Sequence, residues 1–446
     1  MAMRGNLLLL LALAATAVAS GEQNGHHGTS APLQLVPAAP GASMAERARD
    51  DKQRHAYISA QLASRGGRRR AAAEVAGASA FSLPLSSGAY SGTGQYLVRF
   101  LVGTPAQEFL LVADTGSDLT WIKCGGGGDG ASPPARVFRT ADSKSWAPVP
   151  CSSDTCKLDV PFSLANCSGP ASPCSYDYRY KESSAATRGV VGTDSATVGA
   201  SGSKAAAKVQ DVVLGCSSSY DGQSFQSADG VLSLGNSKIS FASRAGGLFS
   251  YCLVDHLAPR NATGYLAFGP GAEAPLARTP LLLDPTMPFY GVTVQSISVA
   301  GKALDIPSDV WDARKNGGVI LDSGTTLTVL ASPAYKAVVA ALSKGLAGVP
   351  TVRFDPFEYC YNWTARRPGA PEIPKLTVQF AGAAALFEPP AKSYVIDVKP
   401  GVKCIGVQEG DWPGVSVFGN IMQQEHLWEF DLKKQSVGFK QTSCTK

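Results

Sequence analysis

Short apolar runs bounded by turn residues recur along the chain from residue 96 onward. The first spans residues 96–102 (YLVRFLV), breaks at a Gly-Thr-Pro turn and resumes at residues 109–113, and a similar run at 289–294 opens the second half. Runs of this length between turn residues predict strands, whereas the patterns at 44–63 and 333–344 predict helices. We therefore expect a mainly all-β fold.

One small motif occurs twice, 208 positions apart. The copies are residues 111–117 (LVADTGS) and 319–325 (VILDSGT), and in each an apolar run ends in Asp, a hydroxyl residue, Gly and another hydroxyl residue. Such a run places the carboxylate where a buried strand turns, and the hydroxyls can orient it. One copy alone would be an ordinary turn. Two matched copies predict two lobes whose carboxylates, on Asp114 and Asp322, face each other across a cleft.

Composition and charge are compatible with such a molecule. With 446 residues, 44% of them apolar and 17% charged, the chain is long enough for two sizeable cores. The basic excess lies in the first 80 residues, because residues 81–446 contain 31 basic and 30 acidic side chains. This balance gives no reason to expect nucleic-acid binding.

The N-terminal region reads as a targeting signal followed by a removable segment. In residues 1–20, Arg4 precedes a Leu-rich run that ends at the cleavage pattern Ala17-Val18-Ala19, and the run is short for a membrane anchor. Residues 21–80 are rich in Ala, Arg and Gly. The run Arg68-Arg69-Arg70 fits a linker, a nucleic-acid patch or a processing site, and the signal peptide favours a basic pro-segment.

Cysteine usage supports the secretory route. All ten cysteines lie after residue 120, and an even number in this compartment favours disulfide bonds. Zinc is the alternative for the four cysteines between residues 151 and 174, although their spacings do not fit a usual zinc knuckle. Three glycosylation sequons agree with secretion: Asn166, Asn261 and Asn362.

Two carboxylates at close range share protons, so that one is ionised and the other protonated at acidic pH. The ionised member can act as general base on a water molecule while the protonated member polarises a carbonyl, without a metal, a cofactor or a covalent intermediate. Other chemistries are less well supported. Only His256 and His426 lie after residue 80, and no His-x3-His pair or serine elbow is present. Glycosidases pair carboxylates, but not on a duplicated Asp-hydroxyl-Gly turn.

Together these motifs resemble the pepsin-like aspartic protease family, and within it the nepenthesin-like plant branch. The resemblance covers roughly residues 93–446. It is carried by residues 103–105 (GTP), 114–117 (DTGS) with Trp121 and Cys124 beyond, 150–153 (PCSS), 229–232 (DGVL), 249–252 (FSYC), 322–325 (DSGT), 418–420 (FGN) and 437–439 (VGF). It implies a bilobal pepsin-like acid protease fold with an active-site cleft between an N-terminal lobe (81–275) and a C-terminal lobe (276–446).

The resemblance also implies roles for single residues. Asp114 and Asp322 would be the catalytic pair, with Ser117 and Thr325 bonded to their outer oxygens. The remaining support would come from Thr115, Gly116, Ser323 and Gly324. Strands at 231–232 and 417–419 would thread beside the two Asp loops. The implied disulfides are Cys216–Cys444 and Cys360–Cys404.

In this family a β-hairpin flap closes over the substrate, and its Tyr is hydrogen-bonded to the Trp that here is Trp121. The best flap Tyr is Tyr180, although a surface strand with alternating aromatics is the alternative reading. The sequence departs from the family at Lys181, where Gly is usual, which would stiffen the hairpin. A second departure is Cys124, which is followed by four Gly instead of further Cys.

The resemblance implies an aspartic endopeptidase, made as a zymogen, that cleaves polypeptides bound as extended strands at acidic pH. We expect a monomer without nucleic-acid or membrane partners, outside the cell in the apoplast or in the vacuole in preference to a plastid. In relatives, basic pro-segment residues sit against the catalytic carboxylates until acidification, and the Arg-rich stretch 47–70 is compatible with this. The alternative is an inactive pepsin-like protein that acts as an enzyme inhibitor or as a binding or storage protein. A glycan-binding glycoprotein would leave the duplicated motif unexplained.

Overall fold

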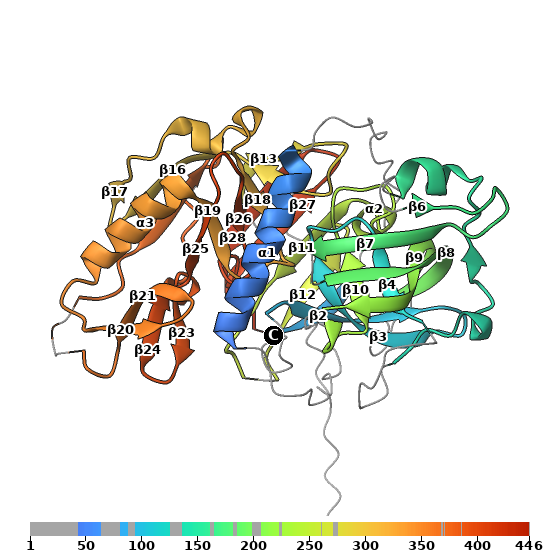
Figure 1. The fold of residues 1–446 in the computed structure, drawn as a ribbon, viewed down its shortest axis with the longest axis horizontal. Helices are drawn as coiled ribbons and strands as arrows, with labels where there is room; N and C mark the ends of the chain where they lie inside the picture. Colours follow the sequence, from blue (N-terminus) through green and yellow to red (C-terminus); the bar gives the residue numbers. More distant parts are fainter. Residues whose placement is uncertain are drawn as a thin grey trace, which may run out of the picture.

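A sheet of 15 strands runs through both halves of the molecule in the computed structural model (Figure 1). The structure describes residues 43–63, 81–87, 94–124, 136–160, 165–181, 185–198, 207–222, 225–259, 261–270, 275–366, 369, 371–384 and 386–445. The path of the sheet is β13-β28-β27-β11-β12-β1-β2-β3-β10-β4-β9-β8-β7-β6, and β5 pairs with β8 beside it. Its strands are β1 (Phe81–Ser87), β2 (Tyr96–Val102), β3 (Gln107–Asp114), β4 (Thr120–Lys123), β5 (Ala147–Pro148), β6 (Ala165–Asn166), β7 (Ser175–Lys181), β8 (Ala185–Val198), β9 (Ala207–Asp221), β10 (Gly230–Ser233), β11 (Leu248–Cys252), β12 (Thr263–Phe268), β13 (Ala277–Pro280), β27 (His426–Asp431) and β28 (Ser436–Gln441).

Three smaller sheets build most of the second lobe. The six-stranded sheet consists of β14 (Leu282–Leu283), β15 (Tyr290–Val292), β18 (Val319–Leu321), β26 (Ser416–Phe418), β19 (Thr328–Ala331) and β25 (Val407–Gly410). The others are formed by β17 (Lys302–Ala303), β16 (Val294–Val299) and β22 (Leu376–Phe380), and by β20 (Thr351–Phe354), β21 (Phe357–Asn362), β24 (Val402–Ile405) and β23 (Val395–Lys399). The α-helices of the described part are α1 (Met44–Ala63), α2 (Phe241–Arg244) and α3 (Ser332–Gly345).

Strands from the end of the chain join the two lobes. β27 pairs with β11 of the first lobe and with β28, which in turn pairs with β13. Across the β11–β27 pair, the rings of Phe249 and Phe430 stack with centroids 4.9 Å apart. The lobes therefore share one continuous sheet, and the predicted boundary at residue 275 falls between β12 and β13. The predicted bilobal, mainly β fold is confirmed.

The strands beside the two Asp motifs thread as expected. β10 runs parallel to β3 with Ser233 opposite Asp114, and β26 runs parallel to β18 with Phe418 opposite Leu321. The runs at 96–102 and 109–113 form β2 and most of β3, while the run at 289–294 is divided between β15 and β16. Both expected helices are present, as α1 and α3. The signal peptide and the three-arginine run lie outside the described residues.

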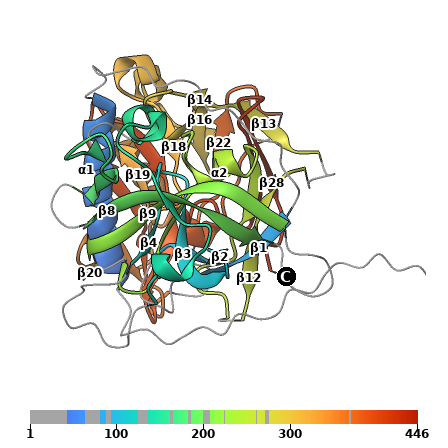
Figure 2. The same ribbon diagram turned by 90° about the vertical axis from the view of Figure 1, so that its right-hand side faces the viewer.

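Helix α1 lies between the lobes (Figure 1), on the side of the molecule away from β1 and β28 (Figure 2). It contacts β7 of the first lobe and β19 and β25 of the second. Its buried positions recur every three or four residues, which is the spacing of one helix face. Towards its start, Met44 and Ala48 pack against Leu327; towards its end, Ile58 packs near Met287. The segment 44–63 is thus docked along its whole length.

The disulfides correct one predicted pair and confirm another. Cys360–Cys404 forms, but Cys216 bonds Cys124 and Cys444 bonds Cys252, so the predicted Cys216–Cys444 pair was wrong. The strand register explains this. β9 runs parallel to β4, with Cys216 opposite Ile122, which brings the end of β4 to Cys216 at a Cα–Cα distance of 5.3 Å.

The residue Cys444 instead follows β28, which returns beside β27 and so beside the end of β11, where Cys252 lies. The remaining bonds are Cys151–Cys167 and Cys156–Cys174. These four cysteines are the candidates that the spacing left open for zinc, and their sulfurs are engaged with each other. They staple a stretch whose strands, β5 and β6, are only two residues long.

Two of the three sequon asparagines, Asn166 and Asn261, are exposed, whereas Asn362 is half-buried and accepts a hydrogen bond from the Thr364 hydroxyl. Glycosylation itself stays a prediction. Within the described residues, none of the helices combines the length and the apolar character that crossing a membrane requires.

Candidate active site

The two motif aspartates end matching strands and are buried together. Asp114 is the last residue of β3, and Asp322 directly follows β18. Both carboxylates are almost fully buried, with 2% and 0% of the residue exposed. The two loops, which are 208 positions apart, therefore meet between the lobes.

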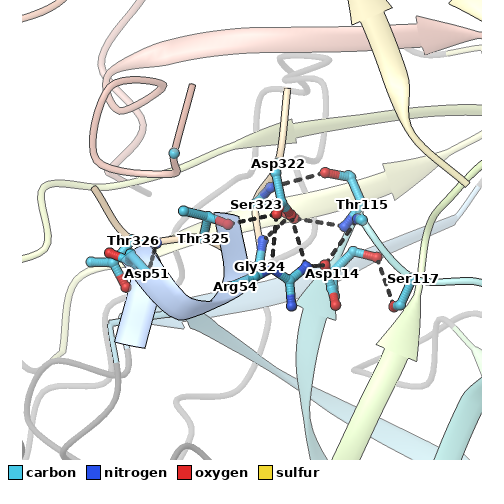
Figure 3. Close-up of polar contacts among 12 residues, drawn as sticks. Asp51, Arg54, Asp114, Thr115, Ser117, Asp322, Ser323, Gly324, Thr325 and Thr326 are labelled. Carbon is cyan, nitrogen blue, oxygen red and sulfur yellow. Dashed lines mark hydrogen bonds and ion pairs between the residues drawn. The ribbon is translucent and has the colours of Figure 1, made fainter. Parts of the chain in front are cut away.

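Reciprocal hydrogen bonds lock the loops to one another (Figure 3). The Thr115 N–H donates to Ser323 Oγ at 3.0 Å, and the Ser323 N–H donates to Thr115 Oγ1 at 2.9 Å. The same hydroxyls donate across the lobes to main-chain carbonyls, Thr115 to Leu321 and Ser323 to Ala113, at 3.2 and 2.8 Å. The small hydroxyl after each Asp thus fixes the relative position of the lobes.

Each Gly of the motif leaves room for the carboxylate of the other loop. The Gly116 N–H donates to Asp114 Oδ1 at 2.9 Å, and the Gly324 N–H donates to Asp322 Oδ1 at 2.8 Å. A Cβ at Gly116 would lie 2.8 Å from Asp322 Oδ1, and one at Gly324 would lie 2.2 Å from Asp114 Oδ1. Any side chain at either position would collide with the opposite carboxylate, so the two carboxylates are close neighbours.

The outer hydroxyls differ between the loops. Thr325 Oγ1 donates to Asp322 Oδ2 at 2.6 Å, as the sequence predicted. Ser117 Oγ donates to the main-chain carbonyl oxygen of Asp114 at 3.4 Å, and its hydroxyl also acts to lower the pKa of the Asp114 carboxyl. Asp322 therefore has the stronger hydrogen-bond support for its ionised form.

A guanidinium from α1 lies between the two carboxylates (Figure 3). Arg54 Nη2 is 2.8 Å from Asp114 Oδ1 and 3.2 Å from Asp322 Oδ1, while Nε is 2.9 Å from Asp322 Oδ2. The planar fork can donate to two carboxylates at once, which a lysine cannot do in the same geometry. Arg54 therefore occupies the space between the two carboxylates.

The pKa directions follow from this arrangement. Burial raises the pKa of Asp114 to about 6; Asp322 adds to the rise, and Arg54 opposes it. Burial also works against the charge of Asp322, but Arg54 and the hydrogen bond from Thr325 outweigh it and lower its pKa. The environments of the pair thus favour one protonated and one ionised carboxylate, the division of roles that acid–base chemistry requires.

Two further side chains of α1 anchor the helix. Asp51 accepts hydrogen bonds from the main-chain N–H groups of Thr326 and Leu327, at 2.9 and 2.7 Å. His55 Nε2 lies 2.6 Å from the main-chain carbonyl oxygen of Val415, which makes the neutral ring a donor there. Burial lowers the pKa of His55. One helix face thus uses a carboxylate, a guanidinium and an imidazole to bind the cleft.

The predicted hydrogen bond of the flap is present. β7 and β8 form a hairpin in which Tyr180 faces inward, and Trp121 Nε1 donates to Tyr180 Oη at 2.7 Å. The ring of Tyr180 lies 5.2 Å from that of Phe225, and the Arg54 guanidinium lies 5.9 Å from its centroid. The side chain of Lys181 lies outside the described residues.

The structure brings Asp114, Asp322 and their neighbours together, as the sequence led us to expect, whereas the sequence did not single out Arg54 or Asp51. The signal was available in part. A face containing Ala48, Ile58 and Leu62 also contains Asp51 and Arg54, and charged residues on an otherwise apolar helix face need partners. The resemblance led us to expect basic residues of the stretch 47–70 against the two carboxylates, and the fold shows that Arg54 is one that lies there.

Comparison with known proteins agrees with this geometry. The family models described as Xylanase inhibitor N-terminal and C-terminal match residues 96–270 and 289–441. Aspartic proteinase nepenthesin-2 of Nepenthes gracilis is 32% identical over 367 residues, which are 80% of this chain and 79% of that protein. Aspartyl protease family protein 2 of Arabidopsis thaliana is 34% identical over 376 residues, 82% of this chain and 74% of that protein.

Two crystal structures show the same fold. The structure of EDGP aligns with a TM-score of 0.65 and 22% identity, covering 82% of this chain and 95% of its own. Basic 7S globulin from soybean aligns with a TM-score of 0.63 and 20% identity, covering 82% and 98%. Since the family models cover both lobes and relatives above 30% identity span about four fifths of the sequence, the chain belongs to the pepsin-like aspartic protease family, in the branch of the nepenthesins and other plant aspartyl proteases.

Proposed function

We propose that this chain is the precursor of an aspartic endopeptidase that hydrolyses peptide bonds at acidic pH. One observation carries the proposal: two buried carboxylates of opposite pKa direction meet on matched, mutually hydrogen-bonded loops. A pair of carboxylates of which one is ionised and the other protonated can hydrolyse a peptide bond without a metal or a nucleophilic side chain. The names of its relatives, an aspartic proteinase and an aspartyl protease, support the same reaction.

In the proposed mechanism a water molecule replaces the Arg54 guanidinium between the carboxylates. Asp322, the ionised member, takes a proton from this water, and Asp114, the protonated member, donates its proton to the peptide carbonyl oxygen. The result is a gem-diol. Its collapse breaks the C–N bond as a proton passes to the leaving amine, and the dyad returns to its singly protonated state.

Helix α1 would keep this reaction off in the precursor. It fills the space between flap and dyad, and a helix cannot present its backbone as the extended strand that such a cleft binds. Arg54 lowers the pKa of both aspartates. The loss of this positive charge favours proton uptake by the dyad when α1 leaves, so lower pH favours release. The proposal includes processing on the secretory route, a monomeric mature form and polypeptide substrates.

The same fold could instead serve binding, since the matching family models are named for a xylanase inhibitor. A direct test separates the two. The full chain is folded, cut at a recognition sequence inserted between α1 and β1, and freed of α1 by acid. We expect this protein to cleave an unfolded protein at pH 4, the variant Asp322→Asn to be slower by at least about 10²-fold, and the surface variant Asp309→Asn to match the wild type. Equal rates for all three would refute the proposal.

A further inference from the structure

A further buried aspartate, Asp118, lines a cavity in the same cleft, beyond Asp114 and Asp322. A cavity of about 70 Å³ opens between α1, the flap strand β7 and the segment from Thr286 to Phe289 of the other lobe. Asp118, four residues after Asp114, contributes to its wall and is only 4% exposed. The mechanism above does not use this residue.

Polar groups gather on the Asp118 side of the cavity. The Asp118 main-chain N–H donates to Tyr178 Oη at 3.3 Å. After burial, the negative charge of Asp118 is the next cause that raises the pKa of Tyr178 and of Tyr57 on α1, the latter to about 12. Both phenol groups therefore lie within electrostatic reach of this carboxylate, and the first lobe gives the cavity an acidic wall.

The opposite wall is apolar. Met287 and Phe289 line the cavity from the second lobe and belong to the same buried cluster as Ile58 of α1. Arg179 of β7 also lines the cavity, and its charge reaches Tyr57. Its side chain is half exposed and lies 3.6 Å from the carboxylate of Asp177, whose negative charge offsets it. A side chain that enters this cavity would meet apolar surface along its stem and a carboxylate at its end.

Helix α1 itself places a side chain with an apolar body and a polar tip in this cavity. Tyr57 lines the cavity from α1, one turn from Arg54 along the helix. A tyrosine has an apolar ring and a hydrogen-bond-donating tip. A lysine or arginine side chain likewise combines an apolar stem with a polar tip. Its tip is cationic, and a buried carboxylate binds it more strongly than it binds a tyrosine hydroxyl.

We infer that, once α1 has left, this cavity is a substrate subsite that selects a lysine or arginine side chain through Asp118. The inference rests on the proposed function, because it assumes that a peptide replaces α1 in the cleft. It assigns Asp118 to specificity and leaves the reaction to Asp114 and Asp322. A substrate would then be favoured when a basic residue lies at one fixed distance from the scissile bond.

Binding to a catalytically silenced protein tests the subsite without requiring turnover. The folded chain carrying Asp322→Asn is cut between α1 and β1, freed of α1, and titrated at pH 6 with fluorescent octapeptides in which one lysine replaces norleucine at each position in turn. We expect one position at which lysine improves the affinity about tenfold. Asp118→Asn should remove this gain, so that the lysine and norleucine peptides bind this variant alike at that position, while Glu108→Gln, a surface change in the same lobe, should keep the gain.

Two results would overturn the inference: lysine and norleucine peptides binding alike at every position, or a lysine gain that survives Asp118→Asn. Failure of the proposed function looks different, because the proteins with Asp322 intact would then bind peptides without cleaving any of them. The uncut precursor gives a second measurement. Tyr57→Lys should hold α1 in place to lower pH than the wild type, and this effect should vanish in the double variant with Asp118→Asn; an unchanged effect there would contradict the assignment.

Discussion

At the scale of single residues, near-identical loops produce two different carboxylates. Asp114 and Asp322 each accept a hydrogen bond from the Gly two residues on, and both contact Arg54. Burial raises the pKa of both, but Arg54 donates two hydrogen bonds to Asp322 and one to Asp114, and Thr325 adds a short hydrogen bond to Asp322. The pKa of Asp322 is therefore lowered, whereas burial prevails at Asp114 and raises its pKa. The asymmetry that the chemistry needs therefore depends on one hydroxyl and the placement of a guanidinium.

Arg54→Gln tests this arrangement. The amide keeps much of the side chain's size but loses the charge that compensates two buried carboxylates, so α1 should bind the cleft less tightly. We expect the uncut precursor to gain peptide-cleaving activity near pH 6 by at least about tenfold. This corresponds to a loss of roughly 1.4 kcal/mol in the free energy with which α1 binds the cleft. Arg49→Gln, an exposed position on the same helix, is the control. An Arg54→Gln precursor as silent as the wild type would contradict the inhibitory role of Arg54.

At the scale of elements, the flap and α1 hold each other. β7 contacts α1, the ring of Tyr180 lies under the Arg54 guanidinium, and Trp121 donates to the Tyr180 hydroxyl. The indole hydrogen bond positions the flap tyrosine from the floor of its own lobe. The flap is therefore held by the lobe and not by the helix alone, and it should keep its position after α1 leaves.

Trp121→Phe should show how much the flap depends on that bond. Phenylalanine retains an aromatic ring beside Phe225 but cannot donate to Tyr180. The free energy of unfolding should fall by about 1–3 kcal/mol, from the lost hydrogen bond and the space left by the smaller ring. Activity of the mature form should fall mainly through kcat/KM, measured with one peptide at several concentrations. Phe225→Leu, which leaves the bond intact, should affect stability more than kcat/KM; the reverse order would argue against a positioning role for Trp121.

At the scale of the whole molecule, the end of the chain ties the lobes together. β27 and β28 extend the sheet of the first lobe, and Cys252–Cys444 closes a loop across a sequence separation of 192 residues. Because the dyad has one carboxylate from each lobe, its geometry depends on this joint.

Removal of Cys252–Cys444 by a double Ser substitution should therefore cost more than removal of Cys360–Cys404, whose separation is 44 residues. The loop-entropy relation gives about 5 and about 4 kcal/mol for the two bonds, and the observed losses should rank in that order. Denaturant unfolding followed by tryptophan fluorescence measures both. A larger loss for the shorter loop would show that the link between the lobes is not what stabilises the fold here.

Acid should act on the whole molecule through α1. Arg54, which also faces Tyr180, lowers the pKa of Asp114 and Asp322, so the loss of its charge acts to raise both when the helix leaves. Release then takes up protons, and it becomes more favourable as the pH falls toward about 6, where Asp114 titrates in the precursor, and further as the pH falls toward the lowered pKa of Asp322. Helix release, followed by a fluorophore on α1, should increase on acidification. Release that is independent of pH, or greater at neutral pH, would contradict this.

The sequence predicts the features of this molecule that depend on residues close together in the chain. Asp114 and Asp322 follow from a repeated apolar-to-turn pattern, and α1 and α3 follow from helical periodicity. Pairings set by strand register are different. Cys216 could be assigned to Cys124 only by knowing that β9 lies beside β4. The stretch 47–70 was expected to cover the two carboxylates, but Arg54 could be chosen within it only by knowing where α1 docks.

The most direct measurement is cleavage of unfolded globin between pH 3 and 6 by the acid-treated precursor, with and without a pepstatin-type inhibitor. We predict cleavage that the inhibitor blocks and that Asp322→Asn abolishes. A correctly folded protein, freed of α1, that leaves globin intact throughout this range would contradict the assignment of Asp114 and Asp322 as a catalytic pair and would favour the binding role of the same fold.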